Sequence, residues 1–338
     1  MFYIKTLFYR YCFVFLGPLL TVSLAVESPA ETVLVETSSY AAVVETLGLS
    51  ELAATFSDAK LDRLAGARSG DSAFALLVAI GAVSVNDFDE ALLDHEAGTL
   101  VQSVKADPVY LQSVTIQAAV SNEDADYLIL ESLLFEALAE DITTGYNVTY
   151  SASWPKYAHD QMIIYGHNDL QHLRQLLFLL RTEGMRPEFR FVAKRSAFKI
   201  REEWGVADEA TPRLPDGTAV AQITEYELFM EFPESADVLR FQELVTRYAK
   251  KDSEDEAGLI YKSWWQPFYR SFVPVAEMEE TREIWVSVGG LKANILSIPD
   301  EEASKLVALR KLSPLWTIEP IALWVNPSFF RYLQGGYK

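Results

Sequence analysis

The feature that most constrains the fold of this chain is a change in composition near residue 150. Residues 26–150 carry 21 acidic and 4 basic side chains, a net charge of −17, and are rich in Ala, Leu and Val. Residues 151–338 are nearly balanced, with 27 acidic and 23 basic side chains, and they hold all seven tryptophans. A shift of this kind is typical of a domain boundary. We therefore expect an acidic domain over 26–150 and a second domain over 151–338.

The first of these domains is expected to be all-helical. Ser38, Asp71 and Asn122 can each cap a helix, because their side-chain oxygens accept hydrogen bonds from the free N–H groups of a first turn. Asp107-Pro108 is a further start signal, with proline at the first helical position. Apolar residues recur behind these caps at helical spacing. Five or six short helices within about 110 residues predict a small bundle.

The second domain alternates between strand and helix patterns. The apolar run 161–166 and the alternating segment 189–198 predict strands on either side of a leucine-striped helix over 168–183. A strand over 223–232, a helix from residue 233 and a strand near 259–261 are expected to follow. This β-α-β-β-α-β order predicts an α+β fold, a ferredoxin-like (split βαβ) sheet with helices on one face. A doubly wound parallel sheet is the alternative.

The end of the chain repeats part of this pattern. Gly289-Gly290 separates two strand-like segments, 283–288 and 291–298, and predicts a two-residue hairpin. A helix over 300–312 and a strand over 317–325 are expected after it. The segment 143–147 contains Thr, Gly and Asn and is typical of a loop.

The N-terminus predicts export. Lys5 and Arg10 precede a mostly apolar run over residues 11–26, and small residues suit a cleavage site after Ala25. This is the pattern of a signal peptide over residues 1–25. A retained anchor is the alternative, although the run is shorter than the ~20 residues that span a bilayer. We expect an exported protein, periplasmic or secreted.

Composition also excludes several chemistries. The single cysteine, Cys12, lies in the predicted signal, so the mature chain has no disulfide, thiolate nucleophile or cysteine-bound metal. Removing the signal leaves 27 basic and 48 acidic residues, a charge that argues against nucleic acid and anionic membranes as partners. Nucleotide-binding glycine motifs and H-E-x-x-H are absent. We expect no cofactor and no bound metal, and a small molecule or a protein as partner.

Histidines are concentrated at the start of the second domain. His159, His167 and His172 lie within 14 residues. His167 falls where a predicted strand passes into a helix, a common functional position, and Asp160 or Asp169 could orient it as a general base. A shared zinc site is disfavoured, because His159 and His167 lie at opposite ends of the strand and His167 and His172 are about 140° apart on a helix.

Aromatic and basic side chains form a second group of candidates. The segment 264–272 holds five large aromatic residues and one arginine, and aromatic faces bind sugars, bases or apolar ligands. A basic stretch over 186–201 can bind an anion or dock on the acidic domain. The predicted ligand-binding residues are Trp264, Trp265, Tyr269, Arg270, Arg190 and Lys194.

Taken together, these patterns favour an exported soluble binding or assembly protein with an aromatic-lined ligand or partner surface. The alternative is an exported hydrolase or lyase that uses a histidine–carboxylate site near the end of the first strand of the second domain. Both hypotheses place the function in residues 151–338, and the sequence leaves open whether the protein is an enzyme.

Overall fold

The computed structural model describes residues 37–66, 70–89, 92–116, 120–121, 123–153, 161–201, 207–248, 268–314 and 316–336. The predicted signal peptide, the strand near 259–261, and the site residues Asp160, Trp264 and Trp265 lie outside the described residues. The chain from Thr37 onward forms one compact unit. None of the helices described in this unit has the length and apolar character required to cross a bilayer.

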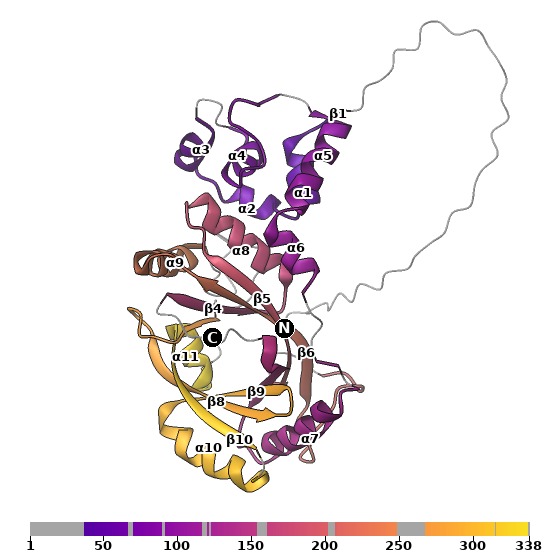
Figure 1. Ribbon diagram of the computed structural model, residues 1–338, viewed down its shortest axis with the longest axis vertical. Coiled ribbons are helices and arrows are strands. Elements are labelled where there is room, and N and C mark those ends of the chain that lie inside the picture. The colour runs from indigo at the N-terminus through magenta and orange to yellow at the C-terminus, as the bar shows by residue number, and fades with distance from the viewer. Residues whose placement is uncertain are drawn as a thin grey trace, which may run out of the picture. The chain divides into compact units, whose positions relative to one another are not determined.

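Eight of the described strands close into an antiparallel barrel (Figure 1). Their order around the barrel is β10-β7-β4-β6-β5-β3-β9-β8, and β8 pairs with β10 to complete the ring. The strands are β3 (Gly145–Tyr150), β4 (Met162–His167), β5 (Glu188–Lys199), β6 (Val220–Glu231), β7 (Phe268–Ser271), β8 (Glu279–Val288), β9 (Leu291–Ser297) and β10 (Thr317–Val325). Since every one of these pairs is antiparallel, the doubly wound parallel sheet is wrong.

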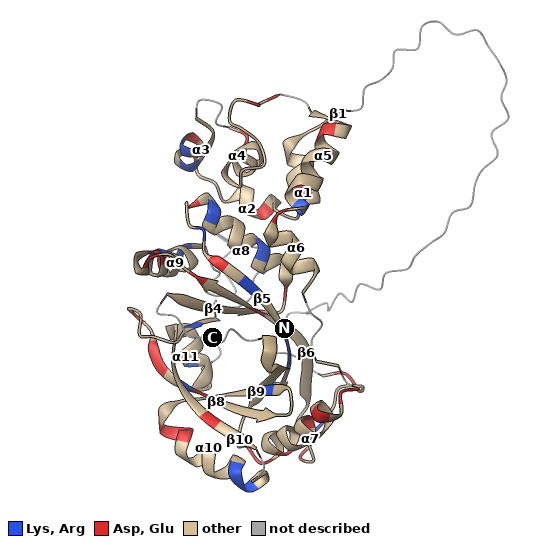
Figure 2. Cartoon of the chain, viewed as in Figure 1, with Lys and Arg blue, Asp and Glu red and all other residues tan. Residues whose placement is uncertain are grey.

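Helices cover the outer surface of the barrel. α8 (Leu170–Thr182) and α9 (Ser235–Tyr248) share a hydrophobic core with β4, β5, β6 and β7. α7 (Ala125–Ala139) and α10 (Pro299–Leu312) share a second core with β3, β8 and β9. Acidic residues open α10 and basic residues close it, as Figure 2 shows, which suits the dipole of a helix. The second face of the sheet, which no helix of these two cores covers, forms the interior of the barrel.

The predicted N-terminal helical domain followed by a ferredoxin-like sheet with helices on one face is therefore wrong. An open sheet would leave β5 and β7 as edges, but β5 pairs with β3 and β7 pairs with β10. Local patterns of strand and helix do not report whether an edge is free, because the partner strands lie far away in the sequence. The hairpin at Gly289-Gly290 is confirmed, since Val288 pairs with Leu291.

The sequence analysis missed two strands of the barrel, β7 and β3. The predicted loop 143–147 overlaps the first three residues of β3, Gly145 to Asn147. Tyr146 and Val148 alternate toward the core beneath α7, while Asn147 takes the opposite face and pairs with both Ser196 and Asn294. The turn-forming composition of the segment was therefore outweighed by long-range pairing. The predicted domain boundary at residue 150 stays a prediction, although β3 precedes it and belongs to the barrel.

Short helices precede the barrel, and several of them start at capping side chains. Ser39, Asp71 and Asp107 accept hydrogen bonds from first-turn N–H groups of α1, α4 and α6. The helices are α1 (Tyr40–Thr46), α2 (Ser50–Ala54), α3 (Asp58–Ala65), α4 (Ser72–Ala79), α5 (Asp94–Lys105) and α6 (Pro108–Val114). A two-stranded sheet, β1 (Thr37–Ser38) and β2 (Leu92–Leu93), accompanies them.

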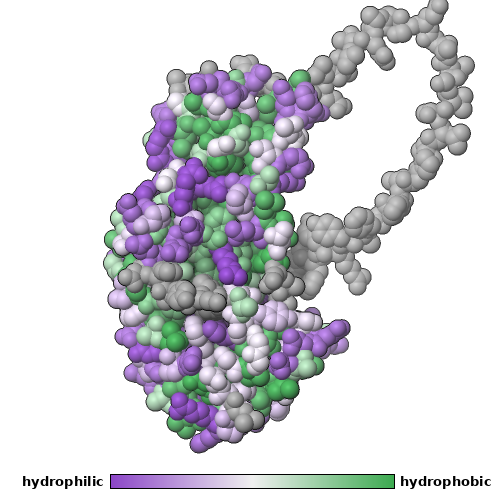
Figure 3. Space-filling model, in the orientation of Figure 1, coloured by the Kyte–Doolittle hydropathy of each residue, from purple (hydrophilic) through white to green (hydrophobic). Residues whose placement is uncertain are grey.

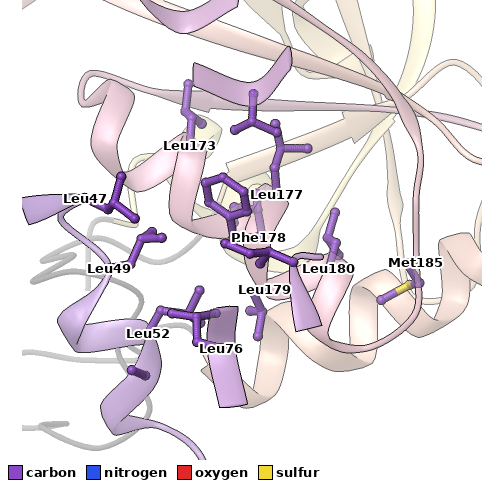
Figure 4. Packing of buried hydrophobic residues seen from close by; sticks show 14 of the residues in the cluster. Leu47, Leu49, Leu52, Leu76, Leu173, Leu177, Phe178, Leu179, Leu180 and Met185 are labelled. Atoms are coloured by element: carbon purple, nitrogen blue, oxygen red, sulfur yellow. The ribbon is translucent and has the colours of Figure 1, made fainter. Parts of the chain in front are cut away.

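These helices pack directly on α8. In Figure 4, Leu49, Leu52 and Leu76 lie on the side of α8 from which Phe178 and Leu179 project, and all five residues are buried. One hydrophobic core thus runs from the N-terminal helices through α8 to the strands β4 and β6. Because burial of apolar area is the main stabilising term in folding, this shared core couples the helices to the barrel.

Candidate functional site

Polar side chains from neighbouring strands meet inside the barrel. They project from β5, β6, β7, β8 and β9, and all are 8% exposed or less. We call them the interior cluster: Lys194, Glu227, Arg270, Glu283 and Asn294. Charged residues are rarely buried in a protein unless they are paired. The interior cluster is therefore the most unusual chemical feature of the described residues.

Ion pairs and hydrogen bonds connect the interior cluster. Glu227 Oε1 accepts from Lys194 Nζ at 2.9 Å and from Arg270 Nη2 at 2.8 Å. Glu283 Oε1 accepts from Asn294 Nδ2 at 2.7 Å and lies 3.7 Å from Arg270 Nη2. Arg270 thus bridges two carboxyl groups that come from strands on different parts of the barrel. This network joins β5 through β9 across the interior.

The two carboxyl groups of the cluster differ in proton affinity. Burial alone would raise the pKa of Glu227, but the charges of Arg270 and Lys194 outweigh burial and lower that pKa to about 2. Burial raises the pKa of Glu283 above its ordinary value, and Arg270 offsets only part of the rise while the charge of Glu227 adds to it. Glu227 is accordingly a permanent anion, and Glu283 is the group that more readily holds a proton.

An apolar layer closes one side of the cluster. Val192, Phe229 and Trp285 each lie two positions along their strand from a cluster residue, so they face the same interior. The layer consists of Met162, Ile164, Val192 and Phe229, with Phe272 and Trp285 packed against them. The polar cluster therefore rests on a packed apolar floor.

On the other side of the cluster lies a cavity of about 450 Å³. Four members of the interior cluster, Lys194, Arg270, Glu283 and Asn294, line it. Further polar lining residues include Asn147, His167 and Glu225. The lining also contains aromatic residues, of which we call Phe198, Phe268, Phe329 and Tyr332 the aromatic rim. Its volume lies within the range of small-molecule sites, about 300–1,000 Å³.

The aromatic rim is held in place by α11 (Pro327–Leu333). Asn326, just before this helix, accepts a hydrogen bond from the Tyr269 N–H at 3.0 Å and donates its own N–H to the Tyr269 carbonyl at 3.2 Å. This reciprocal pair fixes the start of α11 to β7. The Phe329 ring then stacks on Phe268 with centroids 4.7 Å apart, and Tyr332 packs at 5.1 Å from Phe268.

His167, the predicted general base, lines the cavity at the end of β4. Its Nδ1 accepts a hydrogen bond from the Asp169 backbone N–H at 2.9 Å, which assigns the proton of the neutral ring to Nε2. Burial lowers the pKa of His167 and favours that neutral form. The Asp169 carboxylate does not orient the ring, because it caps α8 by accepting from the Gln171 N–H at 2.7 Å. His167 is thus arranged as a hydrogen-bond donor to the cavity.

The histidine pair differs from the expected geometry. His167 and His172 stack with ring centroids 3.9 Å apart and planes at 10°, and His172 Nε2 lies 2.9 Å from Tyr165 Oη. The helical spacing argument was wrong because His167 belongs to β4 and only His172 belongs to α8. His159 lies outside the described residues, and among those described no group of three or more His, Asp or Glu side chains is placed to hold a metal ion.

The other predicted ligand-binding residues separate into two groups. Arg270 and Lys194 meet at Glu227 and line the cavity. Tyr269 points to the outer face of β7 and packs on Phe241 of α9, and Arg190 is exposed on β5 outside the cavity lining. Side chains alternate between the two faces of strand β7, so Tyr269 points to the outer face and its neighbour Arg270 points into the barrel.

Sequence reasoning missed the acidic half of the site. Glu225 and Glu227 alternate with Tyr226 and Leu228 along β6, and Glu283 precedes the buried Ile284 on β8. That period-two pattern of charged and apolar residues was present in the sequence. In an open sheet it indicates a solvent face, and only closure of the barrel turns the same face inward.

Comparisons with protein-family models, curated proteins and solved structures find no match for this chain. The function is therefore argued from the cavity and its lining.

Proposed function

We propose that this chain is a binding protein that holds a small amphipathic molecule in the barrel cavity. The observation that carries the proposal is the pairing of a buried polar cluster at the inner end of the cavity with an aromatic rim supplied by β5, β7 and α11. Small-molecule sites are typically concave and largely apolar, with a few convergent polar groups that fix the orientation of the ligand.

The hydrogen bonding of the interior cluster supports this proposal. Buried polar atoms are normally paired, and a buried unpaired group in a native protein calls for an explanation. Within the part of the chain that the structure describes, Asn294 Oδ1, in a side chain that lines the cavity, has no hydrogen-bond partner. Such a loss costs about 1–3 kcal/mol for each group. A sequence selected for stability alone would favour apolar residues in the interior cluster. A hydrogen-bonding atom left unpaired at the inner end of a cavity instead favours a role in recognising a ligand.

Exposed apolar side chains on the outer surface are the alternative place where a partner could bind. Large exposed apolar side chains occur on several helices, among them Leu111 and Val114 on α6 and Ile129 on α7. On the face seen in Figure 3, hydrophobic residues are interspersed with hydrophilic ones. Single apolar residues of this kind are common on protein surfaces and do not define a docking site. The cavity is the better-defined candidate.

The test is to fill the cavity. Gly166 lines it and lies on the inward face of β4, and a Cβ added there would meet no atom within 4 Å. Gly166→Leu should therefore place a side chain in the cavity. Gly98→Leu is the matched control, because Gly98 is exposed on α5 and a Cβ there also meets nothing within 4 Å.

A thermal-shift screen of small amphipathic compounds against the three proteins gives the readout. A ligand at a hundred times its Kd stabilises the folded state by about 2.7 kcal/mol. We expect compounds that stabilise the wild type and Gly98→Leu but leave Gly166→Leu unchanged. Equal stabilisation of all three proteins would place binding elsewhere and overturn the proposal.

A further inference from the structure

We infer that the ligand of the barrel cavity is a neutral carbohydrate, a polyhydroxylated ring compound with one apolar face. This inference rests on the proposed binding function and specifies the chemical class of the ligand. It is carried by three features of the lining: cations that are already paired, polar groups that both donate and accept, and aromatic side chains at the rim.

Both cations that line the cavity are already paired with carboxylates of the chain. Lys194 and Arg270 both bind Glu227 Oε1, and their next carboxylate neighbours, Glu225 and Glu283, lie 3.7 Å away. An anionic ligand would have to replace Glu227 as the partner of these cations, and a cationic ligand would be placed next to them. Either exchange leaves a buried charge poorly paired, which is strongly unfavourable.

The raised pKa of Glu283 brings the charge of the site closer to balance. Lys194 and Arg270 lie among three carboxyl groups, Glu225, Glu227 and Glu283, and the raised pKa of Glu283 favours its neutral form. Lys292 also acts on Glu283 but lies over the Trp285 ring on the floor side, at 3.3 Å from the ring centroid, and does not line the cavity. The lining therefore matches a ligand without net charge.

The mixture of donors and acceptors matches hydroxyl groups. A hydroxyl group donates one hydrogen bond and accepts others, so it can lie between a cation and a carboxylate and satisfy both. Lys194 and Arg270 are donors, Glu225 is an acceptor, and Asn147 and Asn294 offer both functions. Ser196 Oγ lies 2.6 Å from Asn147 Oδ1 and also contacts the Glu225 carboxylate, so this hydroxyl links the two lining side chains. The neutral His167 ring adds a donor at Nε2.

The aromatic rim provides the complementary apolar surface. A sugar ring presents C–H groups on one face and hydroxyl groups around its edge, and the flat face of an aromatic ring can cover the C–H face. Phe268, Phe329 and Tyr332 form one contiguous aromatic group, and Phe198 lines the cavity from β5. A ligand seated against these rings would direct its hydroxyl groups to the interior cluster.

The first experiment compares ligands on the full-length wild-type protein. Neutral probes are D-glucose, D-galactose, D-mannose, N-acetyl-D-glucosamine, cellobiose and maltose. Charged counterparts are D-glucosamine and D-glucuronate, and charged non-sugars are 2-phenylethylamine and 3-phenylpropionate. Thermal shift selects binders and isothermal titration calorimetry measures Kd. We expect a neutral sugar to bind at least tenfold more tightly than its charged counterpart.

The outcomes separate this inference from the binding function. Binding of charged probes without any neutral sugar overturns the carbohydrate inference and leaves the cavity as a binding site. Absence of binding by any probe of either set counts against both. Binding that survives Gly166→Leu also counts against both, because the sugar would then lie outside the cavity.

Variants test the two halves of the site on any sugar that binds. Asn147→Ala removes a lining amide that can pair with sugar hydroxyl groups and should raise Kd at least tenfold. Tyr332→Leu removes an aromatic rim residue and should raise Kd at least tenfold, about 1.4 kcal/mol. Phe330→Leu on the same helix is its control, because Phe330 does not line the cavity. Unchanged Kd in folded Asn147→Ala and Tyr332→Leu proteins would show that the lining does not hold the sugar and would overturn the inference.

Discussion

At the scale of single residues, the interior cluster places two glutamates in opposite electrostatic states. Glu227 is 1% exposed and has two cationic partners, whereas Glu283 is equally buried and has Arg270 only at 3.7 Å. Burial penalises the charged form of both carboxyl groups, and the number and distance of cations decides which of them ionises. The same substitution should therefore have opposite effects at the two positions.

Glu227→Gln should destabilise the protein strongly. The amide keeps the shape of the side chain but removes the negative charge that Lys194 and Arg270 share, and breaking a buried pair costs about 3–5 kcal/mol. Urea unfolding at pH 7 measures the difference, and Glu188→Gln at an exposed position of β5 should change stability by less than about 0.5 kcal/mol. The folded pKa of about 2 lies below the ordinary value of 4.5, so the contribution is present above pH 4.5 and is lost as the pH falls toward 2. A difference from wild type that does not shrink in acid would contradict this assignment.

Glu283→Gln should become increasingly more stable than the wild type as the pH rises. The folded pKa is raised, so the folded state binds more protons than the unfolded state above pH 4.5, and the wild type loses stability as the pH increases through the folded pKa. The loss amounts to about 1.4 kcal/mol per pH unit over that window. A glutamine carries no titrating proton, so the Tm of the variant relative to wild type should be nearly unchanged at pH 4.5 and increase toward pH 8. A Tm difference that is constant with pH would show that Glu283 is ionised throughout.

At the scale of elements, the β8–β9 hairpin depends on one glycine. Gly289 has φ of +56°, and a Cβ there would press on the Asp126 carboxylate of α7. The left-handed conformation alone costs a residue with a side chain about 1–2 kcal/mol. Gly289→Ala should therefore lower the free energy of unfolding by at least about 1 kcal/mol. Gly290→Ala is the adjacent control, since a Cβ there meets nothing within 4 Å, and equal losses for the two variants would refute the argument.

Elements whose signals are local could be predicted from the sequence, and elements that depend on distant partners could not. The caps Asp71 and Asp107 and the glycine pair at 289–290 act within a few residues of the structure they specify, and each lies where it was expected. β3 has a turn-like composition and is a strand only because β5 and β9 pair with it. The inward carboxylates were visible as an alternating pattern, but their meaning depends on which face of the sheet is enclosed.

At the scale of the whole molecule, closure of the barrel is what creates the candidate site. Arg270 and Lys194 come from strands separated by β4 and β6, while Glu283 and Asn294 come from the part of the ring that β8 and β9 form. Sequence reasoning selected Arg270 as a partner for a carboxylate, and Lys194 as a residue that could bind an anionic ligand or dock on the acidic domain. It had no means to find the carboxylates that neutralise them, because the pairings of β3 with β5 and of β7 with β10 connect distant segments of the chain.

The shared hydrophobic core predicts that the N-terminal helices and the barrel unfold together. Leu76 of α4 is fully buried in the core that also contains α8 and β4, and Leu76→Ala should cost about 2–5 kcal/mol. If the helices and barrel form one cooperative unit, Leu76→Ala should reduce protection from hydrogen exchange equally in α4 and in β4. The core amides of Ile163 and Tyr165 report on β4. Leu111→Ala at a position that is 47% exposed on α6 should leave both regions nearly unchanged. Loss of protection confined to α1–α4, with β4 unaffected, would instead establish the helices as a separate unit, as the change in composition near residue 150 predicts.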